Sequence, residues 1–170
     1  MNPPAAVAQL CPNCGLCCDS TLFADVELRA GDDAKRLKKL GLTVGQKTRT
    51  KLAFAQPCAC FDGRFCQIYA DRPNRCRLFE CGLLKRVEAN EMTASAALRK
   101  ISEAKRRTEK VRGLLRSLGQ SDEQMALTHR YAEAMSAPMD LSDEGGADRH
   151  GELMLAVNDL MTRLQRDFLR

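Results

Sequence analysis

The chain has 170 residues, nine cysteines and a formal net charge of +5. No stretch approaches the roughly 18 apolar residues that a membrane span needs, and the opening MNPPAAVAQL has neither the basic nor the long apolar region of a secretory signal. An odd number of cysteines also argues against a scaffold of disulfides. The composition therefore predicts a cytoplasmic protein without a membrane partner, whose reduced thiols bind metal.

The composition changes near residue 85, which predicts two regions. Residues 1–85 hold every cysteine, whereas residues 86–170 are rich in the Ala, Leu, Glu, Lys and Arg that favour helices. The sequence predicts a helix-dominated α+β fold, with a small metal-stabilised cysteine-rich domain followed by a helical C-terminal region. A proline and a glycine pair predict a linker near residues 136–147.

The first region is expected to contain short elements. TLFADVEL at 21–28 alternates weakly and predicts a strand, and KTRTKLAFA at 47–55 predicts a second one. Between them, DDAKRLKKLG predicts a short helix that begins at an aspartate and stops at Gly41. Because the large apolar residues are few and spread over many loops, bound metal is expected to stabilise this region.

The second region predicts three helices. The first covers residues 93–118 and stops before Gly119, and the second opens with the capping-box pattern SDEQ and covers 121–135. The third covers about 148–169. Its apolar stripe, expected to pack in a core, has helical spacing: Leu153, Val157, Leu160, Leu164 and Phe168.

The segment CPNCGLCC at residues 11–18 places four cysteines in eight positions. Soft thiolates select zinc, copper(I) or iron–sulfur clusters. A bacterial ferredoxin loop would need its fourth cysteine after three more residues and then a proline, but Cys18 follows Cys17 directly and Asp19 comes next. Adjacent side chains usually diverge. The pair therefore fits two neighbouring metals, or two corners of one cluster, and the missing ligands must come from elsewhere.

Further cysteines occur in PCACFDGRFCQIYADRPNRCRLFEC, residues 57–81. Together, CPNCGLCC and the spaced pattern PC…C.IY..RP..CR.F.C resemble the bacterial CxxCxxCC family of zinc- or iron-chelating cysteine-cluster proteins, over residues 11–81. The resemblance implies zinc or an iron–sulfur cluster as the cofactor. It also implies eight metal ligands: Cys11, Cys14, Cys17, Cys18, Cys58, Cys66, Cys76 and Cys81.

The ninth thiol, Cys60, stands where members of this family usually carry an apolar residue, so it is interpreted as accessory. Flagellin lysine methylases, which use S-adenosylmethionine, contain a related cysteine cluster. By analogy, an enzyme of protein modification is one possible function. The sequence contains no convincing nucleotide-binding glycine loop, and no catalytic residue is assigned.

Basic and aromatic residues lie between the cysteines of the second segment: Tyr69, Arg72, Arg75 and Arg77. They could donate hydrogen bonds to sulfurs or attract an anionic substrate. The favoured interpretation is structural, with a turn at residues 71–73 and arginines paired with carboxylates.

Two features of the helical region also have a simple interpretation. His129 and His150 stand alone and are expected at the surface rather than on a metal. The basic run KRRTEKVRGLLR at 105–116 is interrupted by Glu109 and lacks nearby aromatics for stacking bases, so it predicts a solvated helix face rather than a nucleic-acid site.

Three functions remain open. The favoured one is a metal-binding protein, with an iron–sulfur cluster in a structural or electron-transfer role that serves a partner enzyme. The alternatives are a zinc-stapled module for protein or nucleic-acid interaction and a cluster-dependent enzyme. Iron–sulfur is favoured because a compact run with an adjacent pair suits several metal corners close together.

Overall fold

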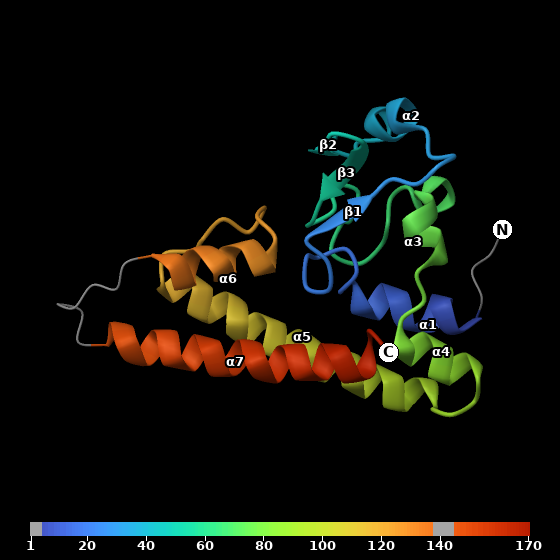
Figure 1. Cartoon of the computed structure of the whole chain (residues 1–170). Helices are drawn as coiled ribbons and strands as arrows, with labels where there is room; N and C mark the ends of the chain where they lie inside the picture. The colour runs from blue at the N-terminus through green and yellow to red at the C-terminus, as the bar shows by residue number, and fades with distance from the viewer. Residues whose placement is uncertain (1–4, 138–144) are drawn as a thin grey trace.

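The structure is a computed structural model that describes residues 5–137 and 145–170. A small sheet-bearing part stands on a layer of longer helices (Figure 1). This arrangement confirms the predicted helix-dominated α+β fold. In chain order the elements are α1 (Ala5–Cys14), β1 (Asp25–Glu27), α2 (Ala34–Lys39), β2 (Val44–Thr48), β3 (Lys51–Ala55), the 3₁₀ turn η1 (Tyr69–Asp71), α3 (Asn74–Leu78), α4 (Gly82–Glu88), α5 (Ala94–Ser117), α6 (Leu127–Ser136) and α7 (Gly146–Asp167).

The sheet has the antiparallel order β1-β3-β2, with Phe54 of β3 opposite both Val26 and Val44. The strand expected at 21–28 is present as the shorter β1. The single strand expected at 47–55 is wrong, because residues 49–50 form a turn and the segment joins the end of β2 to β3. That turn contains neither glycine nor asparagine, the residues that most strongly mark a hairpin.

Helix α2 begins and ends as predicted. The Asp33 side chain caps it by accepting a hydrogen bond of 3.0 Å from the Arg36 backbone N–H. Gly41 follows the helix with a φ of +101°, a conformation that favours glycine. The sheet-bearing part encloses a small hydrophobic cluster of buried residues: Val26, Leu37, Leu42, Val44, Phe54, Cys60 and Ile68.

Two long helices, α5 and α7, pack side by side and form most of the helical layer (Figure 1). Thr93 caps α5, since its Oγ1 accepts a hydrogen bond of 3.2 Å from the Ala96 N–H. The predicted stripe of α7 is confirmed, with Val157 partly buried and the other four residues buried. Both helices thus lie within two residues of their predicted bounds.

The second helix of residues 86–170 was predicted to start at residue 121, and this start is wrong. Residues 121–125 form a turn, in which the Gln124 N–H donates to Asp122 Oδ1 at 2.9 Å, and α6 begins only at Leu127. An aspartate that bonds to the backbone two residues on offers the chain an alternative to helix. Of the predicted linker at 136–147, residues 138–144 lie outside the described residues.

Three helices of the cysteine-rich region were not predicted: α1, α3 and α4. Helix α1 contains Pro12 and packs on α4 and α5. The large hydrophobic cluster of the helical layer includes Leu10 and Leu16 from this segment. The first cysteine segment is therefore anchored in the helical layer, while the boundary near residue 85 stays a prediction. No helix of the described residues is long and apolar enough to cross a membrane.

Candidate metal centre

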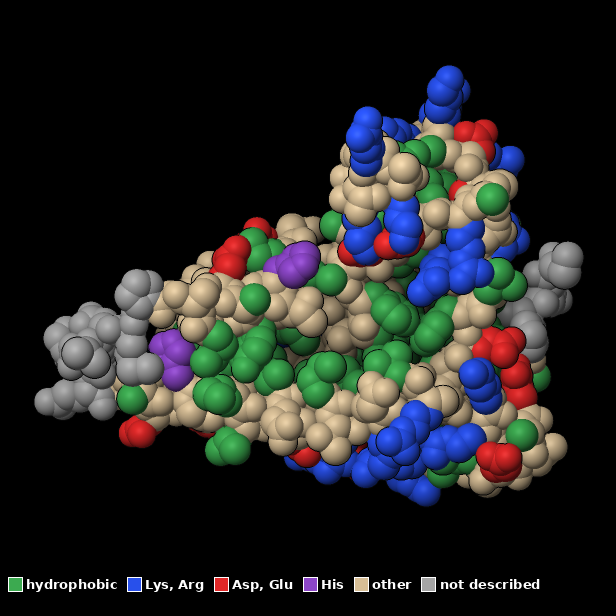
Figure 2. All heavy atoms as spheres, in the orientation of Figure 1, with side chains coloured by type: hydrophobic (Ala, Val, Ile, Leu, Met, Phe, Trp, Pro, Cys, Tyr) green, Lys and Arg blue, Asp and Glu red, His purple; other side chains and the backbone are tan. Residues whose placement is uncertain are grey.

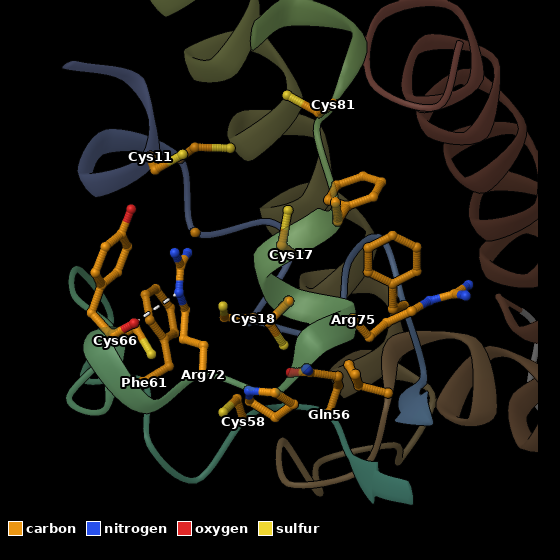
Figure 3. Close-up of a pocket in the computed structure, with 18 of the residues that line it drawn as sticks. Cys11, Cys17, Cys18, Gln56, Cys58, Phe61, Cys66, Arg72, Arg75 and Cys81 are labelled. Carbon is orange, nitrogen blue, oxygen red and sulfur yellow. Dashed lines mark hydrogen bonds between the residues drawn. The ribbon is translucent and has the colours of Figure 1, made fainter. Parts of the chain in front are cut away.

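Eight of the nine cysteines line one cavity of about 800 Å³, where the sheet-bearing part meets the helices. They are the eight predicted ligands: Cys11, Cys14, Cys17, Cys18, Cys58, Cys66, Cys76 and Cys81. All nine cysteines are free thiols. Figure 3 shows labelled cysteines of both sequence segments around this cavity, and Figure 2 shows hydrophobic side chains exposed where the two parts of the molecule meet.

The first segment supplies cysteines from a helix end and the turn that follows it. Helix α1 stops at Cys14, and Gly15 turns the chain with a φ of +75°. The backbone N–H groups of Cys18 and Asp19 both donate to Gly15 O, at 2.8 and 3.0 Å. A Cβ at Gly15 would lie 2.6 Å from the Phe61 ring, so glycine is required there both for the turn and for the contact.

The second segment meets the first through the backbone. The Cys58 N–H donates to Cys18 O at 2.8 Å, which joins the two segments directly. Cys66 forms an isolated bridge with Phe61, Cys76 lies in α3, and Cys81 immediately precedes α4. Short elements thus place four cysteines from 57–81 beside those of 11–18.

The mutual electrostatics of the thiols divide the eight into two sets. The first group consists of Cys11, Cys14, Cys17 and Cys81, and the second group of Cys18, Cys58, Cys66 and Cys76. Beyond the effect of burial, negative charge on Cys81 raises the pKa of each other member of the first group. Charge on the other three members of the second group likewise raises the pKa of Cys18. One influence crosses this division, since charge on Cys18 also raises the pKa of the adjacent Cys17.

Burial is the largest cause of the raised pKa values. It raises the pKa of Cys11 and Cys58 to about 11 and that of Cys14 and Cys76 to about 12. Thiols with such pKa values are neutral near pH 7, because a desolvated thiolate is unfavourable without a cation. A metal ion would supply that cation and displace the protons.

Backbone hydrogen bonds act in the opposite direction on three sulfurs. Hydrogen bonding to the backbone of the residue two positions on lowers the pKa of Cys14, Cys58 and Cys66; the partners are Leu16, Cys60 and Ile68. Such bonds favour the thiolate form and orient the sulfur. The local backbone therefore favours the thiolate form of these three cysteines.

The donor chemistry of the cavity fits a thiolate-bound metal, since eight soft sulfur donors line it. Gln56 also lines it, and although this residue is only 2% exposed, its Oε1 has no hydrogen-bond partner among the described residues. The sulfurs are spread along the wall. Within residues 5–137 and 145–170, no three His, Cys, Asp or Glu side chains already surround a point that could hold an ion.

Arg72 and Arg77 of the second segment bind backbone rather than the carboxylates that we expected. Arg72 Nε donates to Tyr69 O at 3.0 Å, and its guanidinium lies 3.6 Å from the centre of the Tyr69 ring. Arg77 Nε donates to Arg72 O at 2.7 Å. The carboxylate of Asp71 instead pairs with Arg36, at 2.5 Å.

Cys60 lies apart from the cavity wall. It is 5% exposed, belongs to the hydrophobic cluster of the sheet-bearing part, and its thiol donates to Leu40 O at 3.3 Å. It occupies a core position, which explains how a cysteine can stand where an apolar residue is usual.

Neither histidine lines the cavity. His129 is exposed, as expected, but the ring nitrogens of half-buried His150 face Gly146 O at 2.8 Å and Ala134 O at 3.3 Å. The expectation of a solvated basic face holds only in part. Arg107 and Arg112 have side chains 18% and 19% exposed, in ion pairs with Asp159 and Asp19 respectively.

Comparison with known proteins gives one result. Neither a search of curated proteins nor one of solved structures finds a match to the chain. A family model, CxxCxxCC, matches residues 10–111, more than half of the chain, and its description is "Putative zinc- or iron-chelating domain". The matched range contains both cysteine segments and the cavity that they form. This cysteine-cluster protein therefore belongs to the CxxCxxCC family, whose description assigns it the chelation of zinc or iron.

Proposed function

We propose that the protein holds two metal centres, each bound by four cysteines, and that the first is an iron–sulfur cluster. The first group would bind one centre and the second group the other. The observation that carries this proposal is geometric: eight cysteines line one cavity, and Cys18, next to Cys17, is joined to the second segment because its carbonyl accepts the Cys58 N–H at 2.8 Å.

The first group combines a C-x₂-C-x₂-C run with the remote Cys81. In two-cluster ferredoxins, three closely spaced cysteines serve one cluster, while the fourth cysteine of the run ligates the other cluster. Cys18 occupies the corresponding place, since it is the fourth cysteine of CPNCGLCC and its carbonyl accepts the N–H of Cys58 from the second group. The spacing differs from the ferredoxin loop, but the division of ligands is the same.

The residues of the chain would prepare the cavity for such clusters. Neutral buried thiols give up their protons on binding, and backbone hydrogen bonds orient Cys14, Cys58 and Cys66. Phe61, Phe23 and Phe79 line the same cavity and keep water away, which helps to set a reduction potential. A bound cluster would accept and release single electrons. We therefore propose an electron-transfer or structural role that serves a partner protein.

Zinc is the second candidate, because two sets of four thiols also satisfy the tetrahedral Cys₄ site of structural zinc. In that case the centres would staple the sheet-bearing part to α1, as a module for protein interaction. Nucleic acid is the less favoured partner, because several cations of the basic run are already held in ion pairs, among them Lys110 with Glu152 at 2.8 Å.

The identity of the metal is tested by production under iron-replete, oxygen-free conditions, followed by analysis for iron, zinc and acid-labile sulfide. We expect brown protein with sulfide near stoichiometric with iron. Stoichiometric zinc without sulfide would overturn the iron–sulfur assignment and support the zinc candidate.

The number of centres is tested by cysteine variants. We expect Cys81→Ala and Cys76→Ala each to remove about half of the metal, while Cys60→Ala, the matched control outside the cavity, removes none. In the Cys76→Ala background, a further Cys18→Ala change should cost no more metal, whereas Cys17→Ala should remove the remainder. Equal losses from these two double variants would contradict the division.

A further inference from the structure

We propose that Arg72 is a positioning residue shared by both metal centres, with its guanidinium acting as the positive charge between the two four-cysteine groups. This inference rests on the proposed function. It concerns a residue that is not a metal ligand and that neither the family description nor the ligand assignment covers.

The position of Arg72 makes it a neighbour of both groups. It lines the cavity, and Figure 3 shows its guanidinium directed among the labelled Cys11, Cys17, Cys18 and Cys66. Its positive charge lowers the pKa of Cys11 in the first group and of Cys66 and Cys76 in the second.

Two contacts hold the guanidinium in place: it stacks on the Tyr69 ring at 3.6 Å, and its Nε donates to Tyr69 O at 3.0 Å. The backbone of Arg72 is held as well, because its carbonyl accepts a hydrogen bond from Arg77 Nε at 2.7 Å. A planar guanidinium stacks and donates in a fixed plane, which a lysine ammonium does not. No described carboxylate forms an ion pair with Arg72. Its charge therefore remains for the cavity.

The other cations of the cavity wall are differently placed. Lys47 pairs with Asp25 at 2.7 Å and with Glu27 at 3.0 Å, so its charge is balanced by protein. Arg64 lies 5.0 Å from the centre of the exposed Phe65 ring, and Arg29 and Arg75 are themselves exposed. Among the wall cations of the described residues, Arg72 is the one that is half-buried and without an acidic partner.

The charge of the loaded site requires such a group. Four thiolates around a zinc dication, or around a cluster core of charge 2+, leave about −2 on each centre. Two such centres in one apolar cavity repel each other strongly, and a cation between them offsets the repulsion. The same negative charge disfavours an anionic substrate as the ligand of Arg72. The geometry thus favours a fixed counter-charge.

The test compares three variants. Arg72→Gln removes the charge but keeps a polar chain, Arg72→Lys keeps the charge, and Arg75→Gln removes an exposed charge from the same cavity wall as the matched control. Anaerobic competition of each loaded protein with a chelator measures metal retention, whichever metal is bound. We expect Arg72→Gln to weaken retention about tenfold, with most of it recovered in Arg72→Lys and no change in Arg75→Gln.

Iron-loaded protein offers a second readout. Loss of a nearby positive charge disfavours the reduced state, so Arg72→Gln should shift the ratio of reduced to oxidised cluster about tenfold, or about 59 mV toward more negative potential for one electron. Repeating the measurement with Cys81→Ala and with Cys76→Ala isolates the remaining centre. The shift should occur in both backgrounds.

Several outcomes would overturn the inference. An effect on one centre only would refute the shared role, and equal effects of Arg72→Gln and Arg75→Gln would refute the special position of Arg72. If Arg72→Lys retains metal as poorly as Arg72→Gln, the stacking and hydrogen bonding of Arg72 matter rather than its charge. Wild-type protein that binds no metal would refute the proposed function, and this inference with it, whereas loaded wild type with an unaffected Arg72→Gln refutes this inference alone.

Discussion

The two parts of the molecule differ in how they are held together. The helical layer has a continuous core, to which α1, α4, α5, α6 and α7 all contribute buried side chains. The sheet-bearing part has a cluster of seven buried residues, one of which is Cys60, and three short strands. Eight thiols occupy the junction, where a second core would otherwise be needed. Bound metal should therefore contribute more to the stability of the sheet-bearing part than to that of the helical layer.

Removal of metal should have the largest effect. We expect verified apo-protein to lose structure in β1–β3 and in residues 56–81, because metal binding to thiolates can supply about 10 kcal/mol or more, comparable to the whole folding free energy of a small domain. The helices α1 and α5–α7 should stay folded, since their core does not involve the sheet. Hydrogen exchange read by peptide, with far-UV circular dichroism, measures both parts. Unchanged protection in the sheet after metal removal would contradict this view.

Truncation of one buried leucine in each part tests whether the stability of the two parts depends differently on metal. Leu153→Ala in α7 should lower the free energy of unfolding of the helical layer by about 3 kcal/mol, with or without metal, because it leaves a cavity in a close-packed core. Leu37→Ala in α2 should matter only in loaded protein and should speed metal loss to a chelator. Chemical denaturation of both forms distinguishes the two. The idea is wrong if Leu37→Ala destabilises apo-protein as strongly as Leu153→Ala does.

The junction of α4, α5 and α7 should respond to pH through Asp167, which pairs with Lys100 at 3.0 Å and Arg86 at 3.3 Å. Burial raises the pKa of Asp167, but hydrogen bonds from Arg166, Lys100 and Arg86 outweigh burial and lower it to about 2. The stability that results is fully present above the ordinary pKa of about 4 and is lost as the pH falls through about 2. Asp167→Asn should therefore cost about 2 kcal/mol at pH 7 and progressively less in acid. A cost that does not change between pH 7 and pH 2 would exclude the ion pairs as its origin.

The smallest effects concern two glycines, of which Gly82, next to Cys81, packs against the backbone of residues 167–170. A Cβ on Gly82 would lie 2.6 Å from Arg170 O and 2.9 Å from Asp167 O, so Gly82→Ala should displace the end of α7 and cost about 1–3 kcal/mol. Gly151 lies within α7 with nothing within 4 Å of its Cβ position, so Gly151→Ala should stabilise by up to about 1 kcal/mol. Thermal unfolding of both variants provides the comparison. Similar midpoints for the two would show that the contact at Gly82 is not tight.

The sequence by itself determined the elements whose signals are local. The apolar residues of α7 recur at helical spacing along the helix, and the caps at Asp33 and Thr93 act within three residues, so α2, α5 and α7 were predictable. The hairpin over 47–55 and the late start of α6 were not, because a glycine-free turn and the aspartate turn at Asp122 compete with the expected patterns. Helix α1 was missed because a short segment rich in cysteine and proline has no clear apolar period.

The chemistry of the site was also determined locally, since eight thiols at these spacings select soft metals whatever the fold. The two-group partition that we propose depends instead on tertiary contacts. Helix α4 packs beside α1, which brings Cys81 to the first cysteine segment, and the Cys18 carbonyl accepts the Cys58 N–H at 2.8 Å, which joins Cys18 to the second segment. The proposed place of Arg72 between the groups likewise depends on the stack with Tyr69. Spacing fixes which donors are available, but contacts between segments far apart in the chain fix which donors meet.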